Sequence, residues 1–132
     1  MQRMQYAYTA ARILLGLLFV VAGASGFFLI NNPPPMPGLA GAFQDVFFKS
    51  RWVLFVDGVE LVAGVLLLAN RFVPVALLLL AGVLANILVF HITMFPAGIA
   101  PGLIALVLWL IVAMRYKALF APLFAANPTL QS

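Results

Sequence analysis

The chain has 132 residues, of which 66% are hydrophobic and only 8% charged, and it contains no Cys. Seven Lys and Arg with three Asp and Glu cannot form the charged shell of a soluble domain, in which about 25% of residues are charged. The net charge of +4 is scattered between apolar segments and therefore indicates membrane topology, not nucleic-acid binding. The composition excludes a soluble enzyme, a disordered tail and a disulfide scaffold, and it predicts an integral membrane protein.

The first long apolar run extends from Ile13 to Ile30 and is preceded by Arg12. A transmembrane helix needs about 20 mostly apolar residues, so this run is long enough to cross the bilayer. It ends at two Asn and three Pro in residues 31–35 instead of a small-residue cleavage site. We therefore expect a retained transmembrane helix and not a signal peptide.

Residues 31–51 form the only long connection in the chain. The segment opens rich in proline, and then four apolar residues share one helical face: Leu39, Phe43, Val46 and Phe47. The pattern is typical of a short amphipathic helix that lies in the membrane interface. A loop packed over the mouth of the bundle is the alternative, and the sequence leaves both open.

Three more apolar runs follow. The second ends at Asn70, and the third has Pro74 in its first turn, where the missing N–H costs nothing. The fourth is short and is followed by Tyr116 between two basic residues, which are expected to anchor it at the interface. The expected spans are about 12–30, 52–69, 73–95 and 99–115, all in one domain over residues 1–132.

The basic residues predict the orientation of these spans. With four spans, one side carries Arg3, Arg12, Arg71, Arg115 and Lys117, and the other carries Lys49 and Arg51. Because cytoplasmic loops hold the excess of Lys and Arg, both termini are expected in the cytoplasm. The predicted fold is an all-α membrane protein, a bundle of four transmembrane helices with a short amphipathic segment in the first outer loop.

Four polar residues inside the spans are candidate ligand-binding or proton-binding groups: Asp57, Glu60, Asn86 and His91. An ionisable group in hydrocarbon costs roughly 2.5 kcal/mol or more, so it usually faces the bundle interior and has a partner. Two carboxylates one turn apart should not both be ionised unless a cation such as Arg51 pairs with them. The alternative is a structural role in hydrogen bonds between helices.

Helical spacing groups these residues into stripes. Asp57, Glu60 and Gly64 share one face of the second span, and Gly82, Asn86 and Thr93 share one face of the third. A small residue beside polar ones allows membrane helices to approach and form hydrogen bonds, so Gly64 and Gly82 are expected at helix contacts, as are Gly16 and Gly23. His91 points about 140° away from Asn86 and is expected at the rim of the bundle.

The ordered set of motifs resembles the DoxX family of small four-span bacterial membrane proteins. The resemblance rests on Ala11-Arg12-x-Leu14-x-Gly16-x-x-Phe19-x-x-x-Gly23-x-x-x-Phe27, Glu60-x-x-x-Gly64, Asn70-Arg71-Phe72-x-Pro74, Asn86-x-x-x-Phe90-His91 and Pro96-Ala97-Gly98. It implies a location in the bacterial inner membrane and a link to complexes that reduce quinone or oxidise quinol. Some relatives are membrane partners of oxidative-stress enzymes, and no catalytic residue carries over.

Three functions fit these observations. The first is an accessory subunit of a quinone-linked or oxidative-stress redox complex, with an apolar pocket that ends at Glu60, Asn86 or His91. The second is a non-catalytic protein that binds a lipid or a small molecule or assists assembly, with a groove open to the bilayer. The third is a small proton-coupled transporter. We expect no metal site and no catalysis by the chain alone, and as partners the lipid bilayer with a redox protein or further copies of the chain.

Overall fold

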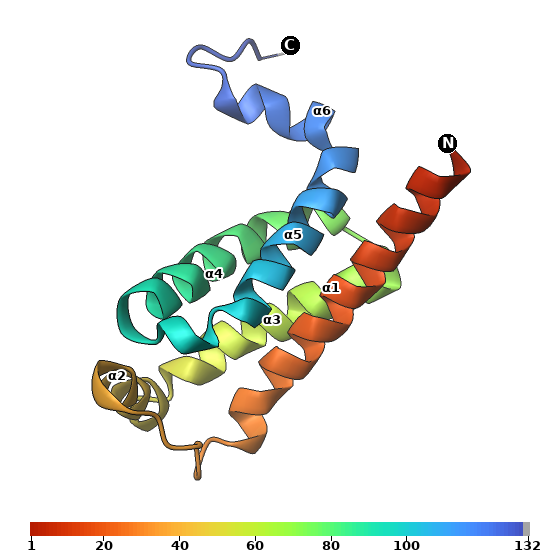
Figure 1. The fold of residues 1–132 in the computed structure, drawn as a ribbon. Helices are drawn as coiled ribbons and strands as arrows, with labels where there is room; N and C mark the ends of the chain where they lie inside the picture. Colours follow the sequence, from red (N-terminus) through yellow and green to blue (C-terminus); the bar gives the residue numbers. More distant parts are fainter. Residues whose placement is uncertain (131–132) are drawn as a thin grey trace.

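The computed structural model describes residues 1–130, and every regular element in this range is helical. Four long helices lie side by side, and the two ends of the chain lie at the same end of the bundle (Figure 1). We call this the terminal end and the opposite end the α2 end. The long helices are α1 (Gln2–Phe28), α3 (Trp52–Ala69), α4 (Val73–Met94) and α5 (Ala100–Arg115).

The fourth span is the shortest of the set. Helices α1, α3 and α4 are each long and apolar enough to cross a membrane. Helix α5 has 16 residues, about 24 Å of helix, which is less than the hydrocarbon thickness of about 30 Å. The chain then bends by 85° into α6 (Lys117–Phe120) and a 3₁₀ turn, η2 (Ala121–Phe124), and α5 together with this bent continuation is the candidate fourth span. The predicted helical membrane bundle is confirmed.

Helix α1 begins at Gln2, ten residues before the expected start of the first span at residue 12. Residues 2–11 contain neither Gly nor Pro, so nothing in the sequence ends the helix there. The extension is held at the end of α5, because the hydroxyl of Tyr8 lies 3.0 Å from that of Tyr116, the residue that follows α5. The guanidinium of Arg115 also lies 4.5 Å from the centre of the Tyr8 ring.

The helices pack in the cyclic order α1–α3–α4–α5, with α1 against α3 and α5, and α4 against the same two helices. Their apolar faces meet in one core along the bundle axis. The largest fully buried side chains of this core are Leu15, Phe19, Leu67, Leu77, Leu80 and Val112.

Helix α2 (Gly38–Lys49) lies across the end of α3 and α4. Ala40 is fully buried there, and the ring of Phe43 lies 5.3 Å from that of Phe90 on α4. Leu39 and Val46 remain exposed, as expected for a helix in the membrane interface. The segment therefore forms the expected short helix. It also packs over the end of the bundle, as the alternative interpretation of a packed loop expected.

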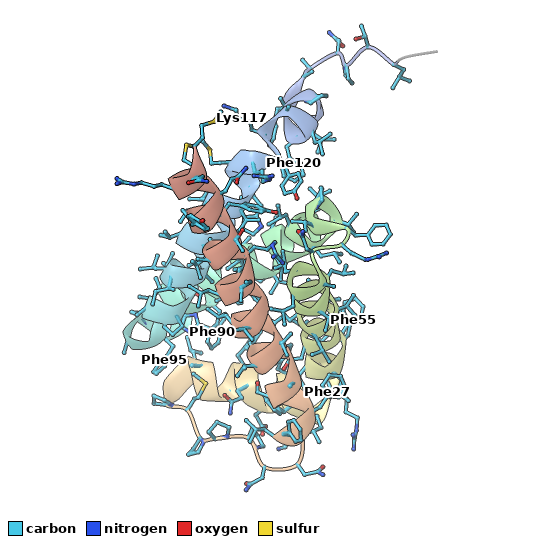
Figure 2. All side chains as sticks on the ribbon, turned by 90° about the vertical axis from the view of Figure 1, so that its right-hand side faces the viewer. Phe27, Phe55, Phe90, Phe95, Lys117 and Phe120 are labelled. Carbon is cyan, nitrogen blue, oxygen red and sulfur yellow. The ribbon has the colours of Figure 1, made fainter. Side chains whose placement is uncertain are left out.

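The basic residues divide between the two ends of the bundle as the topology requires. Arg3 and Arg12 lie on the first half of α1, and Arg71 follows the end of α3. Lys117, labelled at one end of the molecule in Figure 2, lies far from Phe27 at the other end. Lys49 and Arg51 lie at the α2 end, where α2 passes into α3.

Candidate functional site

The two carboxyl groups of α3 lie on the face of that helix that is turned into the bundle. The buried residues of this face follow each other at intervals of four and three: Val53, Asp57, Glu60, Gly64 and Leu67. This spacing keeps side chains on one side of a helix. Asp57 is 8% exposed and Glu60 5% exposed, so both carboxyl groups are held inside the protein.

Asp57 lies against two glycines of α1, Gly23 and Gly26. A Cβ added at Gly26 would overlap the Oδ2 atom of Asp57 and lie 2.7 Å from its Cγ. A Cβ added at Gly23 would lie 2.6 Å from the backbone oxygen of Asp57 and 2.6 Å from the nitrogen of Leu61. Gly26 therefore makes room for the carboxyl group of Asp57, and Gly23 makes room for the backbone of α3 beside it.

The same two helices touch again toward the terminal end. A Cβ at Gly64 would lie 2.8 Å from the nitrogen of Val20 and 2.9 Å from the oxygen of Gly16. Glycines of both helices thus bring the two backbones into contact, which is the geometry of small-residue helix packing in membranes. Gly82 makes no such contact within the described chain, since a Cβ there would meet none of its described atoms within 4 Å.

No basic side chain of the described residues pairs with Asp57 or Glu60. The ion pair found in residues 1–130 joins Lys49 and Asp45 at 3.0 Å on the surface of α2. Arg51 is exposed at the start of α3. Arg12 lies at the terminal end of the bundle, where its guanidinium binds backbone oxygens at the end of α3. The cation that could have balanced the two carboxylates is therefore not supplied by this part of the chain.

Asn86 and Thr93 point away from the buried carboxyl groups. Both are exposed on the outer surface of α4. Asn86 donates a hydrogen bond from Nδ2 to the oxygen of Gly82 at 2.8 Å, and the hydroxyl of Thr93 donates to the oxygen of Val89 at 2.7 Å. The structure therefore does not bring Asn86 together with Asp57 and Glu60.

His91 lies at the rim of the bundle, near the α2 end. Its Nδ1 lies 2.8 Å from the oxygen of Ile87, and its ring lies 5.1 Å from that of Phe90 and 6.3 Å from that of Phe95. Phe90 in turn contacts α2 through Phe43. Within residues 1–130, no group of three or more His, Asp or Glu is close enough to hold a metal ion.

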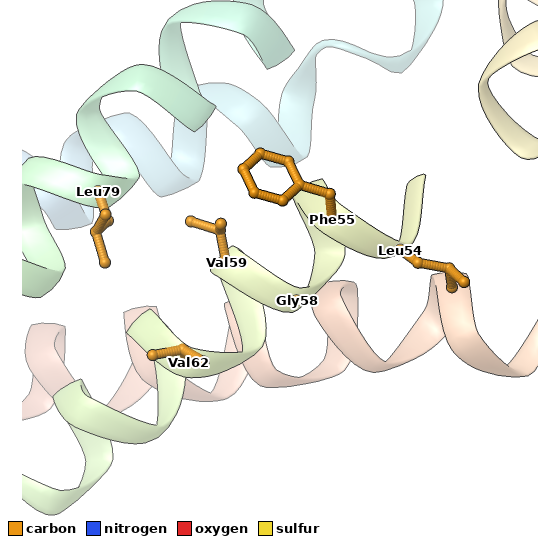
Figure 3. Close-up of a pocket in the computed structure, with 6 residues that line it drawn as sticks. All are labelled: Leu54, Phe55, Gly58, Val59, Val62 and Leu79. Carbon is orange, nitrogen blue, oxygen red and sulfur yellow. The ribbon is translucent and has the colours of Figure 1, made fainter. Parts of the chain in front are cut away.

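A groove on the outer surface of α3 was not foreseen from the sequence. It has a volume of about 390 Å³, and Figure 3 shows its six lining residues on α3 and α4. All six lack a polar side-chain atom: Leu54, Phe55, Gly58, Val59, Val62 and Leu79. Gly58 and Glu60 lie about 200° apart around the helix axis, so the groove lies behind the face that holds the carboxyl groups.

Arg12 has a structural role that the sequence analysis missed, because a basic residue before an apolar run resembles a simple topology signal. It is 8% exposed, and its Nη1 donates hydrogen bonds to the backbone oxygens of Leu67 and Leu68 at the end of α3. The α3 helix ends there with Asn70 in the left-handed conformation and a bond from the nitrogen of Arg71 to the oxygen of Leu66 at 3.0 Å. The guanidinium therefore joins α1 to the last turn of α3.

Comparison with known proteins gives one match. The model of the DoxX family matches residues 7–93, which is more than half of the chain and extends from α1 almost to the end of α4. The matched part includes Asp57, Glu60, Asn86 and His91. No curated protein and no solved structure matches the chain.

Proposed function

Because this chain belongs to the DoxX family, we propose that it is a non-catalytic accessory subunit of a quinone-linked or oxidative-stress redox complex. In this proposal it resides in the bacterial inner membrane with both termini in the cytoplasm. The excess of basic residues at the terminal end of the bundle supports this orientation.

The buried pair of Asp57 and Glu60 is the observation that carries the proposal. Two carboxyl groups buried one turn apart, with no cation of residues 1–130 paired to them, are costly to ionise together, because desolvation and Coulomb repulsion oppose the second charge. In the proposed role, one of the two carboxyl groups carries the proton that is exchanged. Because both groups lie inside the bundle, they suit a subunit that moves a proton within its own helices beside a redox partner.

Quinone chemistry itself is assigned to the partner. A quinone headgroup needs hydrogen-bond donors for its carbonyl oxygens, and the six residues that line the groove on α3 offer no polar side chain. The groove therefore does not fit a quinone headgroup. The role of this chain would be to bind and position the partner.

The groove favours a second candidate, a protein that binds a lipid or assists assembly. It is open to the side of the bundle and is lined only by apolar residues, which suits an acyl chain or an apolar side chain of another helix. This candidate predicts that the chain captures a specific lipid and no redox protein.

Replacing Glu60 with Gln is expected to reduce recovery of the redox partner about fivefold, because the amide keeps the shape of the side chain but removes the titratable carboxyl on which the conformation of the bundle bound by the partner depends. The measurement is affinity purification from native membranes in mild detergent, with detection of a co-purified protein that carries flavin, haem or an iron–sulfur centre. Asp45→Asn, which alters an exposed acid on α2, is the matched control and should leave recovery unchanged.

Thermal unfolding of the purified Glu60→Gln protein separates loss of the partner from loss of the fold. A Glu60→Gln protein that unfolds like wild type and still recovers the partner fully would contradict the role of the carboxyl pair. Recovery of lipid alone with wild type would favour the second candidate.

A further inference from the structure

The outer surface of α4 carries a stripe of five exposed residues at intervals of three and four. We call it the outer stripe, and it consists of Leu79, Gly82, Asn86, Val89 and Thr93. Small and polar residues at this spacing are typical of contacts between membrane helices. The five residues stay exposed in the described chain, because α4 packs on α3 and α5 with its opposite face and α2 contacts α4 beside the stripe, at Phe90.

Asn86 makes the outer stripe unsuited to contact with lipid. It lies about 20 Å along α4 from Val73 and is therefore well inside the hydrocarbon region. One of its N–H groups donates to the oxygen of Gly82. Within residues 1–130, no further hydrogen bond reaches its amide, which keeps one N–H donor and one carbonyl acceptor. Acyl chains cannot satisfy these groups, so a protein partner is required.

Gly82 points to the same conclusion. Glycine weakens a helix relative to alanine, so a glycine in the middle of α4 needs a reason. Inside this chain none is found, because a Cβ at this position would meet no described atom within 4 Å. The missing side chain leaves a notch one turn from Asn86, which allows the backbone of another helix to come close.

We propose that a second copy of this chain docks on the outer stripe, with the two α4 helices related by a two-fold axis along the membrane normal. An amide is both donor and acceptor, so two copies of Asn86 that face each other across the axis satisfy each other. No partner of different chemistry is needed to complete the pair. Leu79, which also lines the groove on α3, extends the contact toward that groove. The dimer does not depend on the redox assignment.

Cysteine cross-linking tests the dimer directly, because the natural chain has no Cys. Val89→Cys places a thiol on the outer stripe, about 8 Å from the end of α4 at Met94. Ile104→Cys is the matched control, since it is 57% exposed against 60% for Val89 and lies about 6 Å from the start of α5 at the same end. After mild oxidation in native membranes, Val89→Cys should form a disulfide-linked dimer and Ile104→Cys should stay monomeric.

Two further variants test the named contacts in lipid nanodiscs or vesicles by energy transfer between labelled copies. Asn86→Leu is expected to weaken dimerisation about fivefold or more. Gly82→Leu should abolish dimerisation while the monomer stays folded, because the space around this position is open within the chain. Equal cross-linking at both cysteines, cross-links of Val89→Cys to a different protein only, or dimers that tolerate both substitutions would overturn the proposal.

Discussion

Gly23→Ala should lower the free energy of unfolding by about 2–3 kcal/mol, although it adds only one methyl group. The new Cβ would lie 2.6 Å from the backbone oxygen of Asp57 and 2.6 Å from the nitrogen of Leu61. These are backbone atoms on the inward face of α3, so they cannot move aside as a flexible side chain could. Helices α1 and α3 would have to separate along the contact that holds Asp57.

The check on Gly23→Ala is reversible unfolding in detergent micelles, followed by the circular dichroism of the helices. Gly58→Ala is the matched control, because its Cβ would have only the ring of Phe27 nearby, at 4.0 Å. The free energy of unfolding of Gly58→Ala should equal that of wild type or exceed it by up to about 1 kcal/mol, because alanine stabilises a helix relative to glycine. Equal stability of the two variants would contradict the close contact of α1 and α3.

Arg12→Ala should lower the free energy of unfolding by about 2–4 kcal/mol, because it removes charged hydrogen bonds to two backbone oxygens. The guanidinium donates to Leu67 and Leu68 where α3 ends, and a cation is favoured at the C-terminus of a helix. Its loss removes the side-chain donor to the oxygen of Leu68 and leaves the oxygen of Leu67 with the N–H of Asn70. It also removes the polar link between α1 and α3 at the terminal end.

Two variants separate this role of Arg12 from its charge. Arg3→Ala removes the same charge from an exposed position on α1 and should change stability by no more than about 0.5 kcal/mol. Arg12→Lys keeps the charge but lacks the planar guanidinium, so its free energy of unfolding should lie between those of wild type and Arg12→Ala. Thermal and denaturant unfolding in micelles measure all three, and equal losses for Arg12→Ala and Arg3→Ala would contradict the capping role.

Helical periodicity was sufficient to place Asp57 and Glu60 on one face of α3 with Gly64. It was not sufficient for α4, where Gly82, Asn86 and Thr93 share a face that points out of the bundle. The two stripes are alike in sequence, since each combines glycine with polar residues. Periodicity shows which residues share a face, but the direction of that face depends on the neighbouring helices, and α4 turns its other face to α3 and α5.

The sequence by itself determined the helical membrane fold and the family, and it left the first long loop open between an amphipathic helix and a packed loop. These properties follow from local composition and spacing. In lipid, each apolar run must pair its own backbone N–H and C=O groups, and a helix does so. Tertiary structure alone decided that Arg12 binds the end of α3, that glycines of α1 make room for Asp57, that Asn86 faces outward and that a groove lies on α3. Each of these depends on contacts between residues distant in the chain, which neither hydropathy nor helical spacing encodes.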